Sequence, residues 1–362
     1  ELYRRGVRNF VVTNVPKGYA SDYPEANFLK VVNTLEALQR LAERHRDEFN
    51  IPIVGITGSN GKTMVKEWLY QLLSPSMFVT RSPRSYNSQI GVPLSVWLMN
   101  EQTEVGVFEA GISQPGEMLA LRDIIQPTIA VLTYLGSAHQ ENFESLEAKC
   151  REKIILFHDA ETIVYNGDDE IVSKVVGEYH DYKGEKLYWS QKDAEAPFFI
   201  KSIEKKNDLT IVTYIYKGEE DSYSLPFIDE ASVTNSIISA VVSRKLGLSA
   251  EDVDKRMSLL EPVAMRLEVK EGQHGCTLIN DSYNSDINSL DIALDFMSRR
   301  PDHKGRRHTL ILSDIFQSGE TPADLYKEVS DLCRKRGVVK FIGVGPQLYE
   351  QSDEIQISEK FF

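Results

Sequence analysis

A glycine-rich turn between a predicted strand and a predicted helix constrains the fold of this chain more than any other feature. The turn, Gly55-Ile-Thr-Gly-Ser-Asn-Gly-Lys-Thr63, follows the apolar run 51–54 and precedes a segment of helical period at 64–73. In this arrangement the backbone N–H groups of the turn and the helix N-terminus can face phosphate oxygens. Lys62 can add a positive charge for the terminal phosphates, and the Thr63 hydroxyl can hold Mg²⁺. The turn therefore predicts a nucleotide-phosphate site on an α/β fold.

The spacing of this turn departs from the usual phosphate-loop rule. Ile56 stands where that rule places its first glycine. The alternative is a glycine turn that only closes a βα unit. A Lys-Thr pair at the helix start, directly after Gly58-Ser-Asn-Gly61, favours the phosphate site over that alternative.

Composition narrows the class of protein. The chain has 362 residues, of which 41% are hydrophobic and 26% charged, so it has room for two or three soluble domains. With 41 basic and 54 acidic residues the net charge is −13, which argues against nucleic acid as a partner. No apolar run approaches the roughly 20 residues of a membrane span. The cysteines share no metal-type spacing and are typical of reduced thiols in a cytoplasmic protein: Cys150, Cys276 and Cys333.

The order of predicted elements indicates an α/β protein with several domains. Short apolar strands without a period of two suit a parallel sheet that is buried on both faces; they lie at 105–108, 128–133 and 162–165. The β-rich stretch 183–228 predicts an antiparallel patch added to that sheet. Helical segments are expected at 28–49, 145–157 and 231–246, with another opening at the capping box Ser249-Ala-Glu-Asp252. The fold class is thus a doubly wound, mostly parallel sheet of the phosphate-loop type.

A second, Rossmann-like α/β unit is predicted after Pro262. Its expected strands and helices are 276–279, a helix from 289, 309–312, 322–336 and 339–344. We expect three domains: 1–24 as the tail of a preceding domain, 25–262 as the central ATP-binding domain, and 263–362 as an incomplete C-terminal domain. The chain begins without Met and stops shortly after a strand, so we expect a fragment or a chain with missing ends.

Three side chains are placed where strands of the central sheet should present ligands. Glu109 directly follows one strand, His139 follows the next, and Lys153 lies on the helix after His139. Taken singly, the commoner interpretations are a solvated loop carboxylate, a structural histidine and a solvated lysine. Together with the turn, however, they would gather at the carboxyl edge of the sheet, where α/β proteins bind ligands.

These motifs, taken in order, resemble the ATP-dependent Mur ligase family of peptidoglycan synthesis. Gly-Ile-Thr-Gly-Ser-Asn-Gly-Lys-Thr is similar to that family's own variant of the phosphate loop. Further motifs follow in the family's order: Tyr86-Asn-Ser-Gln-Ile-Gly-Val-Pro93, Glu109-Ala-Gly111, Ala138-His139, Asn166-Gly-Asp-Asp169, Thr234-Asn235, Met265-Arg266-Leu267 and Asn280-Asp-Ser-Tyr-Asn-Ser285. The resemblance runs from about residue 25 to the end of the chain.

The resemblance implies a metal site and a modified lysine. Glu109 and His139 would ligate Mg²⁺, and Asn87 would position the reacting phosphate. The family carbamylates, with CO₂, a helix lysine 14 residues after the histidine, which is Lys153 here, whereas Lys149 comes too early. Carbamylation turns a cation into an anion that can help to hold a second Mg²⁺, and it requires a neutral amine, which burial favours.

It also implies a set of nucleotide contacts. Asn235 would approach the adenine, Arg266 the ATP phosphates and Asp281 the ribose, with Tyr283 and Asn284 in the nucleotide and acceptor cleft. The remaining contacts would come from the turn: Gly58, Ser59, Asn60, Gly61, Lys62 and Thr63. Asn284-Ser-Asp-Ile287 replaces the family's usual Asn-Ala-Asn-Pro, so the resemblance does not predict the conformation of this loop.

Within the family, the Asp-Ser-Tyr-Asn loop is most similar to the branch that adds D-alanyl-D-alanine to a UDP-N-acetylmuramoyl tripeptide, using ATP and an acyl phosphate. Residues 1–24 would then end a domain that binds the UDP part. Some bacterial ligases of this type are fused to an alanine racemase, which is a possible further domain. Two alternatives stay open: a sister ligase that adds a diamino acid or extends folate with glutamate, and a nucleotide-binding module without catalysis.

Overall fold

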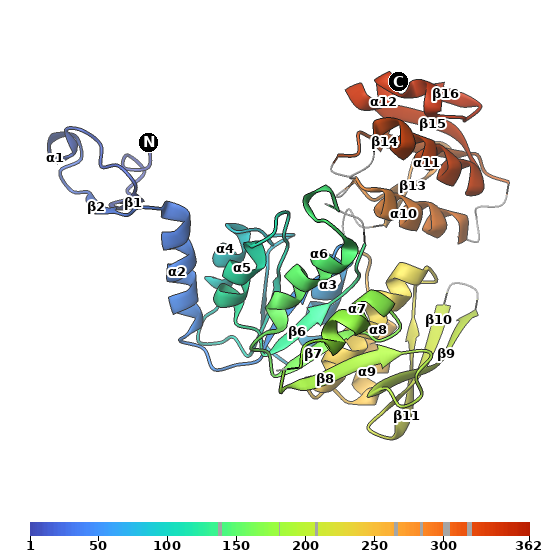
Figure 1. The fold of residues 1–362 in the computed structure, drawn as a ribbon, viewed down its shortest axis with the longest axis horizontal. Coiled ribbons are helices and arrows are strands. Elements are labelled where there is room, and N and C mark those ends of the chain that lie inside the picture. The colour runs from blue at the N-terminus through green and yellow to red at the C-terminus, as the bar shows by residue number, and fades with distance from the viewer. Residues whose placement is uncertain are drawn as a thin grey trace.

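The computed structural model describes residues 1–136, 140–180, 182–206, 209–263, 267–282, 285–299, 305–316 and 321–362. Figure 1 shows a central sheet with helices around it, an N-terminal pair of strands beyond α2 (Thr34–Arg46), and a separate C-terminal part on the other side. Among the described residues, no helix is both long enough and apolar enough to cross a membrane.

The central sheet has nine strands in the order β11-β10-β9-β8-β7-β6-β3-β5-β4. Pairing is parallel from β4 to β9 and antiparallel from β9 to β11. The strands are β3 (Ile53–Thr57), β4 (Val79–Arg81), β5 (Val105–Glu109), β6 (Ile129–Leu132), β7 (Thr162–Asn166), β8 (Glu185–Ser190), β9 (Phe198–Lys206), β10 (Leu209–Tyr216) and β11 (Glu219–Leu225). The mostly parallel sheet with an antiparallel patch is confirmed. The prediction that the patch begins near 183 is wrong, because β8 pairs in parallel with β7 and extends the parallel part.

Side chains alternate between two helical layers, as strand geometry requires. In β3, Val54 and Ile56 pack into one core with α3 (Lys62–Leu73), α8 (Glu230–Lys245) and α9 (Ala250–Met257). Ile53 packs into the other core, whose helices are α2, α4 (Gly91–Val96), α5 (Glu117–Ile125), α6 (Leu146–Lys153), η2 (Ile154–Phe157) and α7 (Glu170–Gly177). Each fully buried aliphatic side chain contributes about 1.5–3 kcal/mol. Burial on both faces explains why these strands lack a period of two.

The N-terminal segment corrects the predicted helix at 28–49. Here β1 (Asn9–Val12) pairs in parallel with β2 (Asn27–Lys30), after the short α1 (Tyr19–Asp22). The helix α2 starts only at Thr34, because the Asn33 side chain caps it by accepting from the backbone N–H groups of residues 35 and 36. Val32, which lies within the predicted helix, is 97% exposed.

The C-terminal part contains two small sheets. A parallel sheet joins β14 (His308–Ser313), β15 (Val338–Val344) and β16 (Glu359–Phe361), and a separate antiparallel pair joins β12 (Glu268–Glu271) and β13 (Thr277–Asn280). The predicted strand at 276–279 therefore belongs to the antiparallel pair and not to the parallel sheet. The helical elements of this part are η3 (Gln273–Gly275), α10 (Ile287–Arg299), α11 (Pro322–Lys335), α12 (Pro346–Glu350) and η5 (Ser352–Glu354), whereas η1 (Gln140–Asn142) lies between β6 and α6. The predicted division into three domains remains a prediction.

Candidate active site

The glycine turn lies between the end of β3 and the start of α3, at the carboxyl edge of the parallel strands. Gly58 and Gly61 both have positive φ angles, of 143° and 87°. A Cβ atom at Gly61 would lie 2.5 Å from the side-chain oxygen of Asn235 on α8, so this close approach requires glycine. No side chain caps the N-terminus of α3 by a hydrogen bond, and Gly61 and Thr63 at this end line a pocket, an arrangement that suits an anion.

Two polar side chains of the turn, Lys62 and Asn60, differ in their hydrogen bonding. The Lys62 ammonium donates to the carbonyl oxygens of Gly58 and Ser59, at 2.8 and 3.1 Å. Both polar atoms of the Asn60 amide are buried, and neither has a hydrogen-bond partner among the described residues. Because buried amides are nearly always hydrogen-bonded, Asn60 indicates a site that is completed by a ligand.

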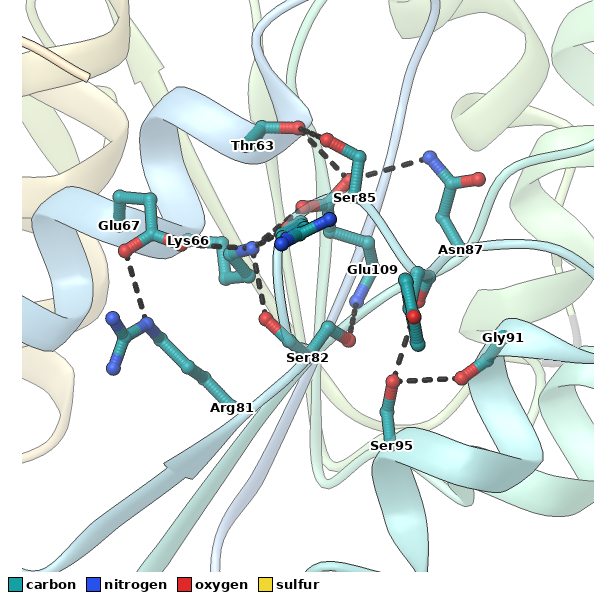
Figure 2. Close-up of polar contacts among 12 residues, drawn as sticks. Thr63, Lys66, Glu67, Arg81, Ser82, Ser85, Asn87, Gly91, Ser95 and Glu109 are labelled. Atoms are coloured by element: carbon teal, nitrogen blue, oxygen red, sulfur yellow. Dashed lines mark hydrogen bonds and ion pairs between the residues drawn. The ribbon is translucent and has the colours of Figure 1, made fainter. Parts of the chain in front are cut away.

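Glu109, at the end of β5, forms the centre of a buried polar cluster (Figure 2). Its side chain is fully buried. One carboxylate oxygen, Oε2, accepts from the Thr63 hydroxyl at 3.1 Å and from the Asn87 amide at 3.3 Å. The Thr63 oxygen also lies 3.1 Å from the hydroxyl oxygen of Ser85. The structure thus brings together three residues that the sequence predicted for metal and phosphate: Thr63, Asn87 and Glu109.

Lys66 is a member of this cluster that the sequence analysis missed. Its ammonium lies 3.1 Å from Glu109 Oε1 and 2.9 Å from Glu67, and its side chain is fully buried. A signal was present, because Lys66 is four residues after Lys62 and so lies on the same face of a helix whose other buried residues are mostly apolar. A charge at such a position indicates a buried partner.

Two further lysines approach the turn from α6. Lys153, 3% exposed, donates to the Gly58 carbonyl at 3.2 Å, and Lys149, 1% exposed, donates to the Gly136 carbonyl at 2.5 Å. Burial, and then the charge of Lys62, lower the pKa of Lys153 well below its usual range. The same two causes lower the pKa of Lys149 to about 8. Both amines are therefore closer to their neutral form than an exposed lysine.

A pocket of about 290 Å³ opens beside the turn. It is lined by Gly61 and Thr63 from the turn, by Asn235 from α8, and by Asp281 and Asn288 from the C-terminal part. The Asp281 carboxylate also accepts from the backbone N–H of residue 267 at 3.2 Å. The pocket is large enough for part of a nucleotide and places two predicted contacts, Asn235 and Asp281, next to the phosphate turn.

Several predicted site residues lie outside the described residues: His139, Arg266, Tyr283 and Asn284. Within the described part of the chain, no three His, Cys, Asp or Glu side chains gather as a metal centre would require. The described donors, a buried carboxylate and the Thr63 hydroxyl, still fit Mg²⁺, which is commonly held by one or two carboxylates together with substrate phosphates and water.

Comparisons with known proteins identify the family and the fold. A family model described as "Mur ligase middle domain" matches residues 56–243. The UDP-N-acetylmuramoyl-tripeptide–D-alanyl-D-alanine ligase of Bacillus subtilis is 28% identical over 329 residues, which are 88% of this chain and 66% of the relative. The ligase of the same name from Escherichia coli is 23% identical, over 92% of this chain and 73% of the relative. The chain thus spans about two thirds to three quarters of the length of these curated relatives.

Solved structures show the same fold. The MurF ligase of Thermotoga maritima, solved in complex with ADP, has a TM-score of 0.82 at 23% identity, over 99% of this chain and 80% of that one. MurF from Acinetobacter baumannii has a TM-score of 0.81 at 20% identity, over 97% of this chain and 74% of that one. Because the family model covers more than half of the 362 residues, this protein belongs to the Mur ligase family.

Proposed function

We propose that the protein is an ATP-dependent ligase that joins D-alanyl-D-alanine to a UDP-N-acetylmuramoyl tripeptide, as a step of peptidoglycan precursor synthesis. The observation that carries the proposal is the buried cluster of Glu109, Thr63 and Asn87 beside a phosphate turn. Relatives named UDP-N-acetylmuramoyl-tripeptide–D-alanyl-D-alanine ligase, such as those of Borreliella burgdorferi and Mycobacterium bovis, match 94% and 82% of the chain, which supports this branch of the family. The proposed location of the reaction is the cytoplasm, and a fused alanine racemase domain stays a prediction.

ATP would bind with its phosphates on the turn and its nucleoside in the adjoining pocket. The MurF ligase of Thermotoga maritima was solved in complex with ADP, which supports a nucleotide at this fold. Asn235 would face the adenine and Asp281 the ribose, since both line the pocket next to Gly61. Arg266, Tyr283 and Asn284 complete the proposed set by resemblance. The Lys62 ammonium would exchange its carbonyl partners in the turn for phosphate oxygens.

The chain would hold Mg²⁺ through Glu109 and Thr63, with His139 as a further proposed ligand. When bound, the ion would neutralise charge on the phosphate oxygens and on the transferring phosphoryl group. Asn87 shares Glu109 Oε2 with Thr63, so it would hold the carboxylate in one orientation and present its amide towards the phosphate.

Lys153 would carry a carbamate. Its neutral amine would attack CO₂, forming a C–N bond and releasing one proton, so that a cation is replaced by an anion. The lowered pKa makes the neutral amine accessible. Because Lys153 reaches the Gly58 carbonyl, the new anion would lie beside the phosphate turn. That position suits a second Mg²⁺ ligand.

Amide formation would proceed in two steps. The tripeptide carboxylate attacks the γ-phosphorus of ATP, the bond to the bridging oxygen breaks, and ADP leaves with that oxygen. The amine of D-alanyl-D-alanine then attacks the acyl carbon, phosphate departs with the former carboxylate oxygen, and the ammonium loses its proton. Lys62 and Arg266 would balance the charge that develops on the phosphoryl group, a contribution that preorganised donors make in a dry site.

The test is phosphate release from Mg·ATP by the natural protein, in the presence of UDP-N-acetylmuramoyl tripeptide. D-alanyl-D-alanine, a diamino acid and glutamate are offered in turn as acceptors. We expect release only with D-alanyl-D-alanine. Release with another acceptor would assign the protein to a sister branch, and ATP binding without release under any condition would favour a non-catalytic module.

A further inference from the structure

Building on the proposed function, we propose that Lys66 is the positioning residue that fixes Glu109 for metal binding. Lys66 contacts one carboxylate oxygen, Oε1, while Thr63 and Asn87 contact the other, Oε2. The Glu109 carboxylate, as the metal ligand, would therefore be held at both of its oxygens: Lys66 contacts one, and Thr63 of the phosphate turn contacts the other.

Lys66 is anchored at four points. It forms ion pairs with Glu109 and Glu67 at 3.1 and 2.9 Å. It also donates to the carbonyl oxygen of Ser82 at 2.9 Å and to that of Arg84. Figure 2 shows the ammonium between these groups, reached from α3. A lysine with this many fixed partners has little freedom, so the carboxylate beside it is fixed as well.

The same contacts fix the segment that carries Asn87. The Ser82 hydroxyl accepts from the Glu109 backbone N–H at 3.2 Å, while the Ser82 carbonyl accepts from Lys66. Lys66 thus ties the segment after β4 to α3, and Ser82 ties it to the end of β5. The three elements that present Thr63, Asn87 and Glu109 meet at one buried ammonium.

A purely structural role for Lys66 makes a different prediction. Lys66 also forms an ion pair with a second carboxylate, that of Glu67. The Glu67 side chain is 19% exposed and forms a further ion pair with Arg81 at 3.0 Å. If Lys66 only fastened α3 to the sheet edge, loss of the Glu67 charge would have the same consequences as loss of Lys66. If Lys66 positions Glu109, only the loss of Lys66 would affect metal binding.

The experiment measures Mn²⁺ binding to the natural protein with ADP present, by the electron paramagnetic resonance signal of free Mn²⁺. Supporting residues of a metal ligand typically contribute about 10- to 100-fold in affinity, and we expect a loss of that size for Lys66→Met. For Glu67→Gln we expect affinity within about twofold of wild type, because Glu109 keeps its partner. ADP binding without metal should be unchanged in both variants.

Each outcome decides the proposal. Unchanged Mn²⁺ affinity in Lys66→Met, or an equal loss in Glu67→Gln, would overturn it. If Lys66→Met does not fold, Lys66→Gln replaces it, since it keeps a polar side chain at this position but removes the charge beside Glu109 Oε1. Mn²⁺ binding about tenfold weaker is expected, and no change would overturn the proposal. Absence of Mn²⁺ binding in the wild type would reject the metal site of the proposed function itself, whereas phosphate release tests the ligase separately.

Discussion

The two sides of the glycine turn both bury lysines, but they give them different partners. On the β5 side, Lys66 is fully buried between two carboxylates. On the α6 side, Lys149 and Lys153 are almost as buried and donate to backbone carbonyls. A carboxylate carries a negative charge that balances a buried ammonium, whereas a backbone carbonyl supplies only a dipole. Similar burial therefore goes with ion pairs on one side, at Lys66, and with lowered pKa values on the other, at Lys149 and Lys153.

The difference separates a positioning role from a reactive one. Lys66 suits a permanent tether for Glu109, because its contacts are satisfied in one arrangement. Lys153 suits covalent chemistry, because a neutral amine is the form that reacts with CO₂. Burial alone could not have distinguished these roles. The groups that each lysine contacts distinguish the positioning role from the reactive one.

The largest expected effect comes from Lys62, which lies between the two sides. Lys62→Ala removes the cation that would meet the terminal phosphates, and we expect a loss of about 10²–10³ in ligase rate, the usual size for a charge-stabilising donor. Glu109→Ala should also abolish useful turnover. The measurement is acceptor-dependent phosphate release, with circular dichroism to show that each variant is folded. Near-normal turnover in either would contradict the assignment of the turn.

The second largest expected effect concerns the α6 side of the turn, where Lys153 lies. Lys153→Met removes the proposed carbamate, and we expect about a 10- to 100-fold loss of rate, as for other groups that support a metal site. Carbon-13 NMR of protein equilibrated with labelled bicarbonate should show a carbamate signal in the wild type and none in this variant. Lys149→Met is the matched control, since it removes a buried lysine one turn earlier on α6 and should keep the signal. A signal that disappears only in Lys149→Met would move the modification to that residue.

A smaller effect concerns stability and pH. The pKa of Lys149 is lowered from 10.5 to about 8 in the folded protein by burial and then by the charge of Lys62. Between about pH 8 and 10.5 the folded protein therefore binds fewer protons than the unfolded chain, and its stability rises with pH. Urea unfolding across this range should show a shallower rise in Lys149→Met than in wild type. Equal slopes would show that this amine is not desolvated as described.

The smallest expected effect comes from a control substitution at the N-terminus of α9. The Ser249 side chain caps α9 by accepting from the Asp252 backbone N–H at 3.0 Å. Ser249→Ala should cost about 1 kcal/mol of unfolding free energy. It should change neither Mn²⁺ affinity nor the carbamate signal. A change in either would mean that these readouts follow overall stability and do not report the two sides of the turn.

The sequence predicted the fold where local signals were strong. The phosphate turn, the buried parallel strands and the antiparallel β9–β11 patch follow from glycine spacing and apolar runs. The predicted start of α2 was wrong, because the apolar residues at 28–32 continue the helical period. The cap at Asn33 and the pairing of β1 with β2 set the observed start of the helix. Parallel pairing of β8 with β7 depends on the crossover through the intervening helix α7, which the pattern within β8 itself does not encode.

The candidate site was predicted only in part. Glu109, Thr63 and Asn87 were identified through motif order, and they do lie together. Lys66 and the burial of Lys149 were missed because a lysine in a helical segment is normally solvated, and only three-dimensional packing shows otherwise. The roles of His139 and Arg266 remain predictions.

The central claim is that this site makes an acyl phosphate from the tripeptide carboxylate. The most direct measurement uses tripeptide labelled with oxygen-18 in the carboxylate that receives D-alanyl-D-alanine, and mass analysis of the phosphate released by the natural protein. The proposed mechanism predicts that each phosphate carries one carboxylate oxygen, since the bond that breaks in the second step is the acyl carbon–oxygen bond. Phosphate without the label, released at the same rate as the amide forms, would contradict it.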